Sequence, residues 1–191
     1  MMRSSMHKRA LFTALLAMSF ACDASQWQID TNESEISFTA TQNDAPVTGK
    51  FTGFKGDIDF DPKQLATSKV FVSIDTNSVT TSYKQVADTL KTDDWLNVKI
   101  FPEATFKSNN ITQKGNNQYE ANGTLTIRNI SLPMTINFEL NNPSQNKSQV
   151  KGKTTIKRNS FGVGQGEWSS TEEVKDIVSV DFNLILKAQN K

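Results

Sequence analysis

The chain has 191 residues, which is room for one domain of ordinary size, and its 36% hydrophobic and 21% charged residues are typical of a globular protein. The formal net charge is only +1. Because there is no basic excess, binding to nucleic acid or to an anionic membrane surface is not expected.

The first 24 residues differ from the rest and have the pattern of a secretory signal peptide. Arg3, Lys8 and Arg9 precede an apolar run of 12 residues, 10–21. That run is too short for an integral membrane span. We therefore expect cleavage after Ala24 and export of residues 25–191.

A second interpretation makes Cys22 the lipidated first residue of an anchored lipoprotein. Ser19 stands three places before Cys22, where a lipoprotein signal usually has Leu, and the bulky Phe20 follows it. The lipoprotein is therefore the less favoured alternative.

Cleavage after Ala24 would change the chemistry available to the protein. It removes three basic residues and one acidic residue, so the formal charge falls from +1 to −1, and it removes the only histidine, His7, and the only cysteine, Cys22. A mature chain without imidazole or thiol lacks Ser-His-Asp triads, Cys-His pairs and the usual zinc or copper ligands. The sequence therefore predicts no catalytic residue, no metal and no cofactor.

From Gln26 onward, alternating apolar and polar residues predict about nine β-strands, mostly sequential and antiparallel. They fall at residues 27–30, 35–40, 47–60, 69–79, 104–111, 118–129, 133–140, 149–159 and 178–189. The strand at 47–60 must bulge or bend, because its apolar residues change parity between Phe51 and Phe54.

One helical insertion interrupts the strands. Tyr83, Val86, Ala87 and Leu90 recur at helical spacing, and the pair Ser82/Gln85 fits a capping box at the helix start. A short turn is expected at residues 93–97, before Pro102 restores extended structure.

These elements predict an all-β domain. One helix cannot cover nine strands, so the sheet must cover itself as a sandwich or as a barrel. Long, bulged strands with glycines at intervals favour a closed antiparallel β-barrel of about eight strands.

The apolar faces of the strands supply the candidate interior. Two interpretations stay open, because these side chains either fill the barrel or line a cavity that holds one small ligand. The inward candidates are Ile36, Phe38, Phe51, Val72, Ile74, Phe106, Leu125, Ile127, Ile136, Phe138, Phe182 and Leu184.

Three short motifs carry weaker signals. Ser148–Lys151 matches the Ser-x-x-Lys pattern of some acyl-enzymes but lies in a polar loop pattern, without companion motifs. The alternating acids of Asp57–Asp61 are better explained as the wet face of a strand than as a calcium loop. The glycines of Gly162–Gly166 precede no helix pattern, so a turn is favoured over a phosphate site.

Several ordered motifs resemble the YceI-like family of periplasmic polyisoprenoid-binding proteins, over about Trp27 to Lys187. The most specific are Phe-Pro-x-Ala-x-Phe at Phe101–Phe106 and Leu-Thr-Ile-Arg-Asn at Leu125–Asn129. Others include "GKFTGFKGDIDFDP", "DDWLNVKIFPEATFKS" and "VSVDFNLILKAQ".

The resemblance implies a lipocalin-like barrel with a helical insertion and a tunnel for an isoprenoid, a quinone tail or another long-chain lipid. Tyr83, Thr89 and Trp95 are the expected contacts at its mouth. Many relatives carry His where this chain has Thr89, so no imidazole contact to a head group is expected here. The alternatives are an enzyme that uses carboxylates at the barrel mouth and a filled barrel that serves as a protein-interaction module.

Overall fold

In a computed structural model of the chain, residues 26–144 and 146–189 are described, and they form one sheet of eleven strands with one short helix. The helix is α1 (Lys84–Leu90), and three 3₁₀ segments are η1 (Thr76–Ser78), η2 (Arg158–Phe161) and η3 (Gly166–Ser169). The strands are β1 (Gln26–Ile29), β2 (Glu35–Gln42), β3 (Ala45–Phe51), β4 (Phe54–Asp59), β5 (Lys69–Asp75), β6 (Val79–Thr81), β7 (Glu103–Gly115), β8 (Gln118–Ile127), β9 (Ile130–Asn141), β10 (Lys147–Lys157) and β11 (Ile177–Ala188).

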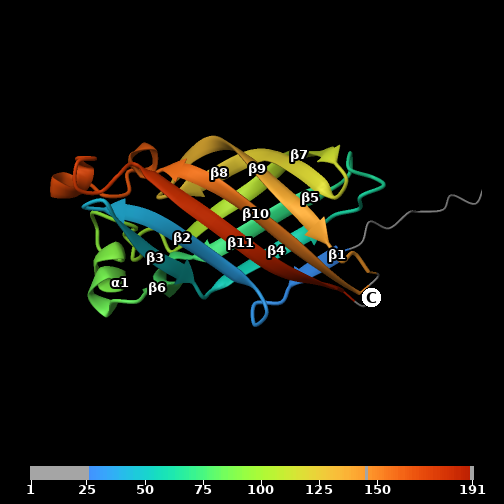
Figure 1. Ribbon diagram of the computed structural model, residues 1–191, viewed down its shortest axis with the longest axis horizontal. Helices are drawn as coiled ribbons and strands as arrows, with labels where there is room; N and C mark the ends of the chain where they lie inside the picture. Colours follow the sequence, from blue (N-terminus) through green and yellow to red (C-terminus); the bar gives the residue numbers. More distant parts are fainter. Residues whose placement is uncertain (1–25, 145, 190–191) are drawn as a thin grey trace, which may run out of the picture.

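Eight of the strands close into an antiparallel barrel (Figure 1), as the sequence predicts. The ring runs β1–β4–β5–β7–β8–β9–β10–β11 and returns to β1. Trp27 of β1 makes the closure, because it pairs with Ile58 of β4 and with Ala188 of β11. Closure leaves these eight strands without an open edge along the seam.

The other three strands extend the wall beyond one end of the seam. β2 pairs with β11 over Ser179–Asn183, nearer the N-terminal end of β11 than β1 does, and β3 and β6 follow in turn. The number of strands is therefore eleven, not nine, because two predicted strands are broken in the middle. One breaks at Thr52 and Gly53, where Gly53 accepts a hydrogen bond from the Asp75 amide (2.9 Å), and the other at η1.

Helix α1 lies over one end of the barrel, but it starts differently from the prediction. Its N-cap is Tyr83 in an extended conformation, with no capping hydrogen bond from the side chain. The Ser82/Gln85 capping box is therefore wrong. The chain arrives from β6 in extended form, and the Thr81 hydroxyl donates to the Tyr83 carbonyl (2.7 Å), which moves the helix start beyond Ser82.

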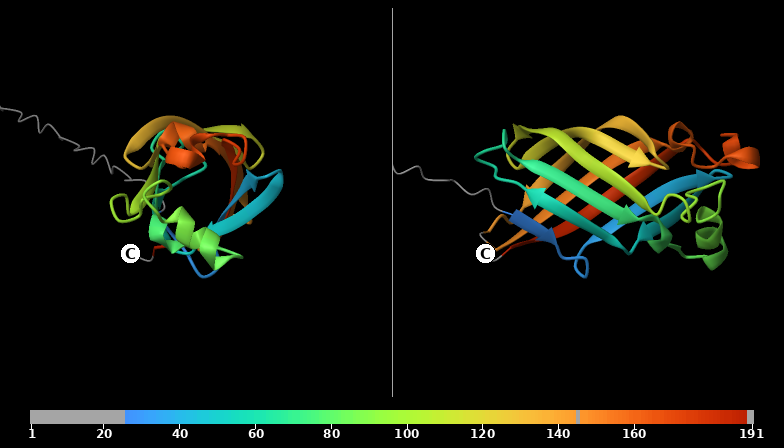
Figure 2. Two further views of the ribbon diagram at one scale, coloured as in Figure 1. Left: turned by 90° about the vertical axis from the view of Figure 1, so that its left-hand side faces the viewer. Right: turned by 180° about the vertical axis from the view of Figure 1, so that it is seen from behind.

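The two ends of the barrel are closed in different ways (Figure 2). Residues 82–102 and 158–176 cover the end that faces the viewer in the left panel, which we call the cap end. Aromatic residues close the opposite end. Tyr119 lies 5.3 Å from Phe60 and 5.4 Å from Phe138 between ring centroids, and the Trp27 indole donates to the Phe60 carbonyl. These four residues form the aromatic floor.

No helix within residues 26–144 and 146–189 combines the length and the hydropathy needed to cross a bilayer.

Candidate functional site

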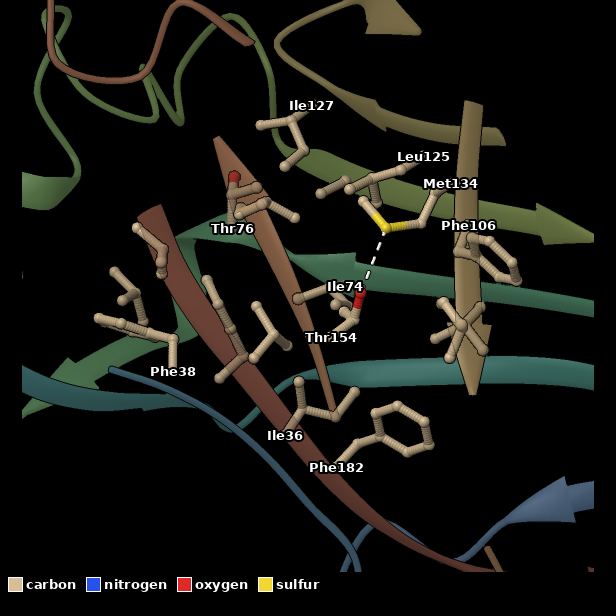
Figure 3. A pocket seen from close by; sticks show the side chains of 18 of the residues that line it. Ile36, Phe38, Ile74, Thr76, Phe106, Leu125, Ile127, Met134, Thr154 and Phe182 are labelled. Atoms are coloured by element: carbon tan, nitrogen blue, oxygen red, sulfur yellow. Dashed lines mark hydrogen bonds between the residues drawn. The ribbon is translucent and has the colours of Figure 1, made fainter. Parts of the chain in front are cut away.

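A cavity of about 270 Å³ lies inside the barrel, between the aromatic floor and the cap end (Figure 3). Pockets for small molecules usually measure about 300–1,000 Å³, so this cavity lies just below that range. Its wall exposes no polar surface. An open, apolar interior is evidence against the filled barrel.

All twelve inward candidates from the sequence lie along this cavity. Figure 3 labels seven of them, among them Ile36 and Phe38 of β2, Phe106 of β7 and Phe182 of β11. Alternation explains their position, because residues two apart on a strand share a face and the outer face is polar. Their role as ligand contacts stays a prediction.

Of the three predicted mouth residues, one lines the cavity. Trp95 is buried and forms part of the wall at the cap end. Tyr83 is 75% exposed and lies outside the lining, because it precedes α1 rather than belonging to its inner face. Thr89 also lies outside it, since its hydroxyl donates to the Gln85 carbonyl (3.0 Å) one turn earlier.

The sequence prediction missed two groups of lining residues. The first lies on the same inward faces of the strands as the predicted residues, and alternation could have identified it. It includes Val150, Thr154 and Ile156 of β10, and Val178 and Val180 of β11. The second comes from the segments over the cap end, where no periodicity places a side chain: Leu96, Val163 and Val174.

Glycines on the inner face help to keep the cavity open. A Cβ at Gly152 would meet Phe182 Cζ at 2.2 Å, one at Gly49 would meet Phe38 Cζ at 2.4 Å, and one at Gly123 would meet Phe106 Cζ at 2.8 Å. Each phenylalanine ring therefore lies over a glycine on a neighbouring strand. The ring covers the wall instead of filling the lumen, because glycine leaves room for it.

The hydroxyl groups among the lining residues are already engaged, whereas the buried indole N–H of Trp95 has no hydrogen-bond partner among the described residues. The Thr76 hydroxyl donates to the Phe101 carbonyl (2.8 Å), and the Thr154 hydroxyl contacts Met134 Sδ at 3.4 Å. None of the lining residues that the structure describes carries a carboxylate. The interior therefore suits hydrocarbon and offers no group for acid–base chemistry.

Arg158 is the one charged residue of the lining, and it is 1% exposed. It continues the inward parity of β10. Its guanidinium donates to five backbone carbonyls between Val163 and Lys175 and to the Asn159 side chain, at 2.7–3.3 Å. Six acceptors occupy all five N–H groups of an arginine.

This arrangement makes Arg158 a clamp for the segment 158–176 rather than a ligand for an anionic head group. The guanidinium also lies over the Trp95 ring, at 5.6 Å from the centroid. Burial lowers the pKa of Arg158 from its ordinary value, and nearby Asp176 opposes that shift. The carbonyl at Gly164 can approach because a Cβ there would come within 2.2 Å of Arg158 Nη1.

The weaker motifs do not form a second site. Ser148 and Lys151 lie in β10 rather than in a loop, and their spacing of three places them on opposite faces, with Ser148 buried and Lys151 exposed. Asp57 and Asp59 alternate with the buried Ile58 in β4. In residues 26–144 and 146–189, no three His, Cys, Asp or Glu side chains gather in a way that could hold a metal ion.

Comparison with sequence families gives one match over most of the chain. The profile of the YceI-like domain matches residues 27–186. Among curated relatives, a UPF0312 protein of Shewanella oneidensis is 31% identical over 168 residues, which are 82% of this chain and 88% of the relative. A UPF0312 protein of Vibrio cholerae is 29% identical over 158 residues, or 78% and 84% of the two chains.

Solved structures share the same fold. The crystal structure of BcnA from Burkholderia cenocepacia is 32% identical and has a TM-score of 0.79, over 82% of this chain and 98% of BcnA. A polyisoprenoid binding domain from Saccharophagus degradans, described as implicated in plant cell wall breakdown, has a TM-score of 0.69 at 15% identity. That match covers 86% of this chain and 99% of the domain.

Proposed function

This chain belongs to the YceI-like domain family, and on that premise we propose that it binds a polyisoprenoid, a quinone tail or a similar long apolar lipid inside the barrel. The single observation that carries the proposal is the cavity, which has no polar surface and lies behind the aromatic floor. A charged or strongly polar ligand would lose its hydration there without compensation, whereas a prenyl chain has no charged or polar group whose hydration must be replaced.

The energetics of such a complex need no charged contact. A prenyl chain that buries about 600 Å² gains roughly 15 kcal/mol at about 25 cal/mol per Å². Association costs of about 4–15 kcal/mol offset much of that gain. Apolar contact can therefore hold the lipid without help from a cation, which agrees with Arg158 being fully used inside the protein.

The known neighbours support the lipid class. The Saccharophagus degradans domain is described as polyisoprenoid binding, and its fold is the same closed barrel. We extend that ligand class to this chain because its own cavity is apolar along its whole wall.

Binding without catalysis is the second part of the proposal. The enzymatic alternative needs carboxylates at the mouth of the barrel, and no carboxylate belongs to the lining that the structure describes. The interaction-module alternative needs a filled barrel, which the cavity of about 270 Å³ opposes.

The periplasm is the proposed location. This part of the proposal rests on the signal peptide expected at residues 1–24, which lie outside the described residues. Residues 25–191 contain no cysteine, so no disulfide has to form within them after export.

Native mass spectrometry of protein purified from the periplasm of its own host tests the function. We expect one lipid per chain, seen as a mass shift that organic extraction removes, and saturable uptake of geranylgeraniol by the extracted protein. A protein that carries no lipid and takes up no geranylgeraniol would contradict the proposal.

A further inference from the structure

In residues 26–144 and 146–189, four large apolar side chains are strongly exposed, and all four lie at the cap end. They are Tyr83 (75%), Ile100 (65%), Ile177 (49%) and Ile130 (38%). The register fixes their place, because Ile130 begins β9 where β8 ends, and Ile177 begins β11 where β10 ends. Tyr83 and Ile100 belong to the segment 82–102 that covers this end (Figure 2).

The barrel wall is also interrupted at this end, in two places. The pairing of β9 with β10 stops at Asn137 and Lys153, although β9 begins at Ile130 and β10 continues to Lys157. Beyond that point the contact between Met134 Sδ and the Thr154 hydroxyl joins the strands (Figure 3). The second interruption lies between β6 and β7. Among the described strands β6 pairs with β3 alone, so no ladder joins β6 to β7.

The four exposed side chains flank these two interruptions. Ile130 is the first residue of β9, and Ile177 pairs with Lys157, the last residue of β10. Tyr83 follows β6, and Ile100 precedes β7. The opposite end is closed by the aromatic floor. The weakest part of the wall and the most apolar part of the surface therefore coincide.

We propose that the cap end docks on a lipid bilayer through Tyr83, Ile100, Ile130 and Ile177, and that the ligand passes there between the membrane and the cavity. This inference rests on the proposed function, since a long isoprenoid resides in membranes. We call these four residues the rim.

A bilayer fits the rim better than a protein partner does. The rim residues come from the start of β9, the start of β11 and the segment 82–102, so they are distributed over several elements at the interrupted end of the barrel. A fluid bilayer accepts each side chain separately, and tyrosine suits the boundary between water and acyl chains.

The charges at this end indicate how the docking works. Lys84 pairs with Asp88, and Lys175 pairs with Asp44 at 3.4 Å. Arg128 donates to the carbonyls of Asp93 and Trp95. Lys91 and Lys99 have no ion pair within the described part of the chain, but the segments 82–102 and 158–176 together carry seven acidic and five basic residues. Because this end has no surplus of cations, the attraction is apolar, and a zwitterionic membrane is sufficient.

The test compares wild-type protein with a rim variant, Tyr83→Ser/Ile100→Thr/Ile130→Thr/Ile177→Thr. Threonine keeps the β-branched shape that strands favour, and serine is a good residue at a helix N-cap. The measurement is flotation with vesicles of phosphatidylcholine alone, and with phosphatidylglycerol added. We expect the wild type to float with both kinds of vesicle, and the rim variant to partition at least about tenfold less.

A matched control changes two exposed residues at the far end of the barrel, Gln113→Thr/Gln118→Thr, and should float like the wild type. Three results would overturn the docking proposal. The first is a wild type that does not float, and the second is flotation with anionic vesicles only. The third is a rim variant that changes the protein from dimer to monomer in sedimentation without affecting flotation.

Geranylgeraniol delivered in solution separates this inference from the proposed function. Uptake by both proteins, with extraction from vesicles slowed only in the rim variant, supports docking. Uptake by a wild type that does not float overturns docking and leaves the lipid-binding function in place. Flotation by a wild type that takes up no isoprenoid supports the surface and contradicts the proposed ligand.

Discussion

Phe138 and Glu139 are neighbours in β9 with opposite surroundings. Phe138 lines the cavity and stacks on Tyr119 at 5.4 Å, whereas Glu139 is exposed on the outer face. A carboxylate in place of the half-buried ring would face the apolar cavity without a partner there, at a cost of several kcal/mol or with a raised pKa. The two positions therefore make a matched pair.

We predict that Phe138→Asp abolishes isoprenoid binding and that Glu139→Ala leaves it nearly unchanged, as measured by geranylgeraniol titration. Phe138→Ala separates binding from folding. It should weaken binding and cost less than the roughly 3–5 kcal/mol of a phenylalanine truncation in a filled core, because one side of the ring already faces space. A full loss of that size in urea unfolding, together with unchanged binding, would show that Phe138 serves packing alone.

Gly152 lets the Phe182 ring lie flat against the wall. In Gly152→Ala the new Cβ would stand 2.2 Å from the ring and 2.6 Å from the Asn137 carbonyl oxygen, so the ring must turn toward the lumen. We predict a smaller cavity, weaker geranylgeraniol binding, and a loss of about 1–3 kcal/mol in unfolding free energy.

Gly115→Ala is the control for that change, because its nearest atom is the flexible end of Gln118 at 3.3 Å. Adding Phe182→Leu to Gly152→Ala should recover part of the lost stability, since the clash with the ring is gone. Equal behaviour of the two alanine variants would refute the role given to Gly152.

At the scale of elements, the seam between β1 and β11 is stabilised by side-chain and loop contacts in addition to the hydrogen bonds of the β-ladder. Asp30 directly follows β1, its amide donates to the Ile185 carbonyl (2.8 Å), and its carboxylate pairs with Lys187 of β11. The hydrogen bond that the Lys187 ammonium donates to the Asp30 carboxylate holds the pKa of Asp30 below its ordinary value. The same bond raises the pKa of Lys187 above its ordinary value.

These shifts predict a pH window for the seam. The Asp30 contribution is present above the unfolded pKa of Asp, about 3.9, and is lost as pH falls through the lower folded pKa. The Lys187 contribution is present below about pH 10.4 and is lost as pH rises through the higher folded pKa. The pair therefore stabilises the barrel throughout the range between these limits.

A double-mutant cycle with Asp30→Asn and Lys187→Gln measures this contribution by urea unfolding. We expect coupling between the two residues at pH 7 and none at about pH 2, where the carboxyl is protonated. Coupling of equal size at both pH values would mean that the two side chains interact by packing rather than by charge.

At the scale of the whole molecule, cleavage of the signal peptide determines which residues the exported protein contains. Residues 1–24 carry the expected signal, and we predict that the mature chain begins near Ser25 and that Cys22→Ala does not change its location. N-terminal sequencing and intact mass of periplasmic material check this. A diacylated Cys22 in the membrane fraction would show instead that the protein is an anchored lipoprotein.

Whole-molecule geometry also separates the two ends of the barrel. The aromatic floor closes one end with interlocking rings, whereas irregular segments held by Arg158 cover the other. The two ends of the barrel therefore differ, and the end with the interrupted wall is the one that carries the rim proposed to dock on a membrane.

Alternation along the strands predicted an all-β domain and the inward direction of residues such as Ile36, Phe138 and Leu184, because side-chain period two is a local property. The same parity reaches Arg158. The bulged strands with glycines favoured a closed barrel of about eight strands over a sandwich. Strand parity could not show that the inward side chains surround a cavity instead of filling the barrel. That outcome depends on contacts between phenylalanine rings and glycines on other strands. The place of Tyr83 and the loop residues of the lining were decided by tertiary structure alone, because packing across distant segments leaves no periodic trace in the sequence.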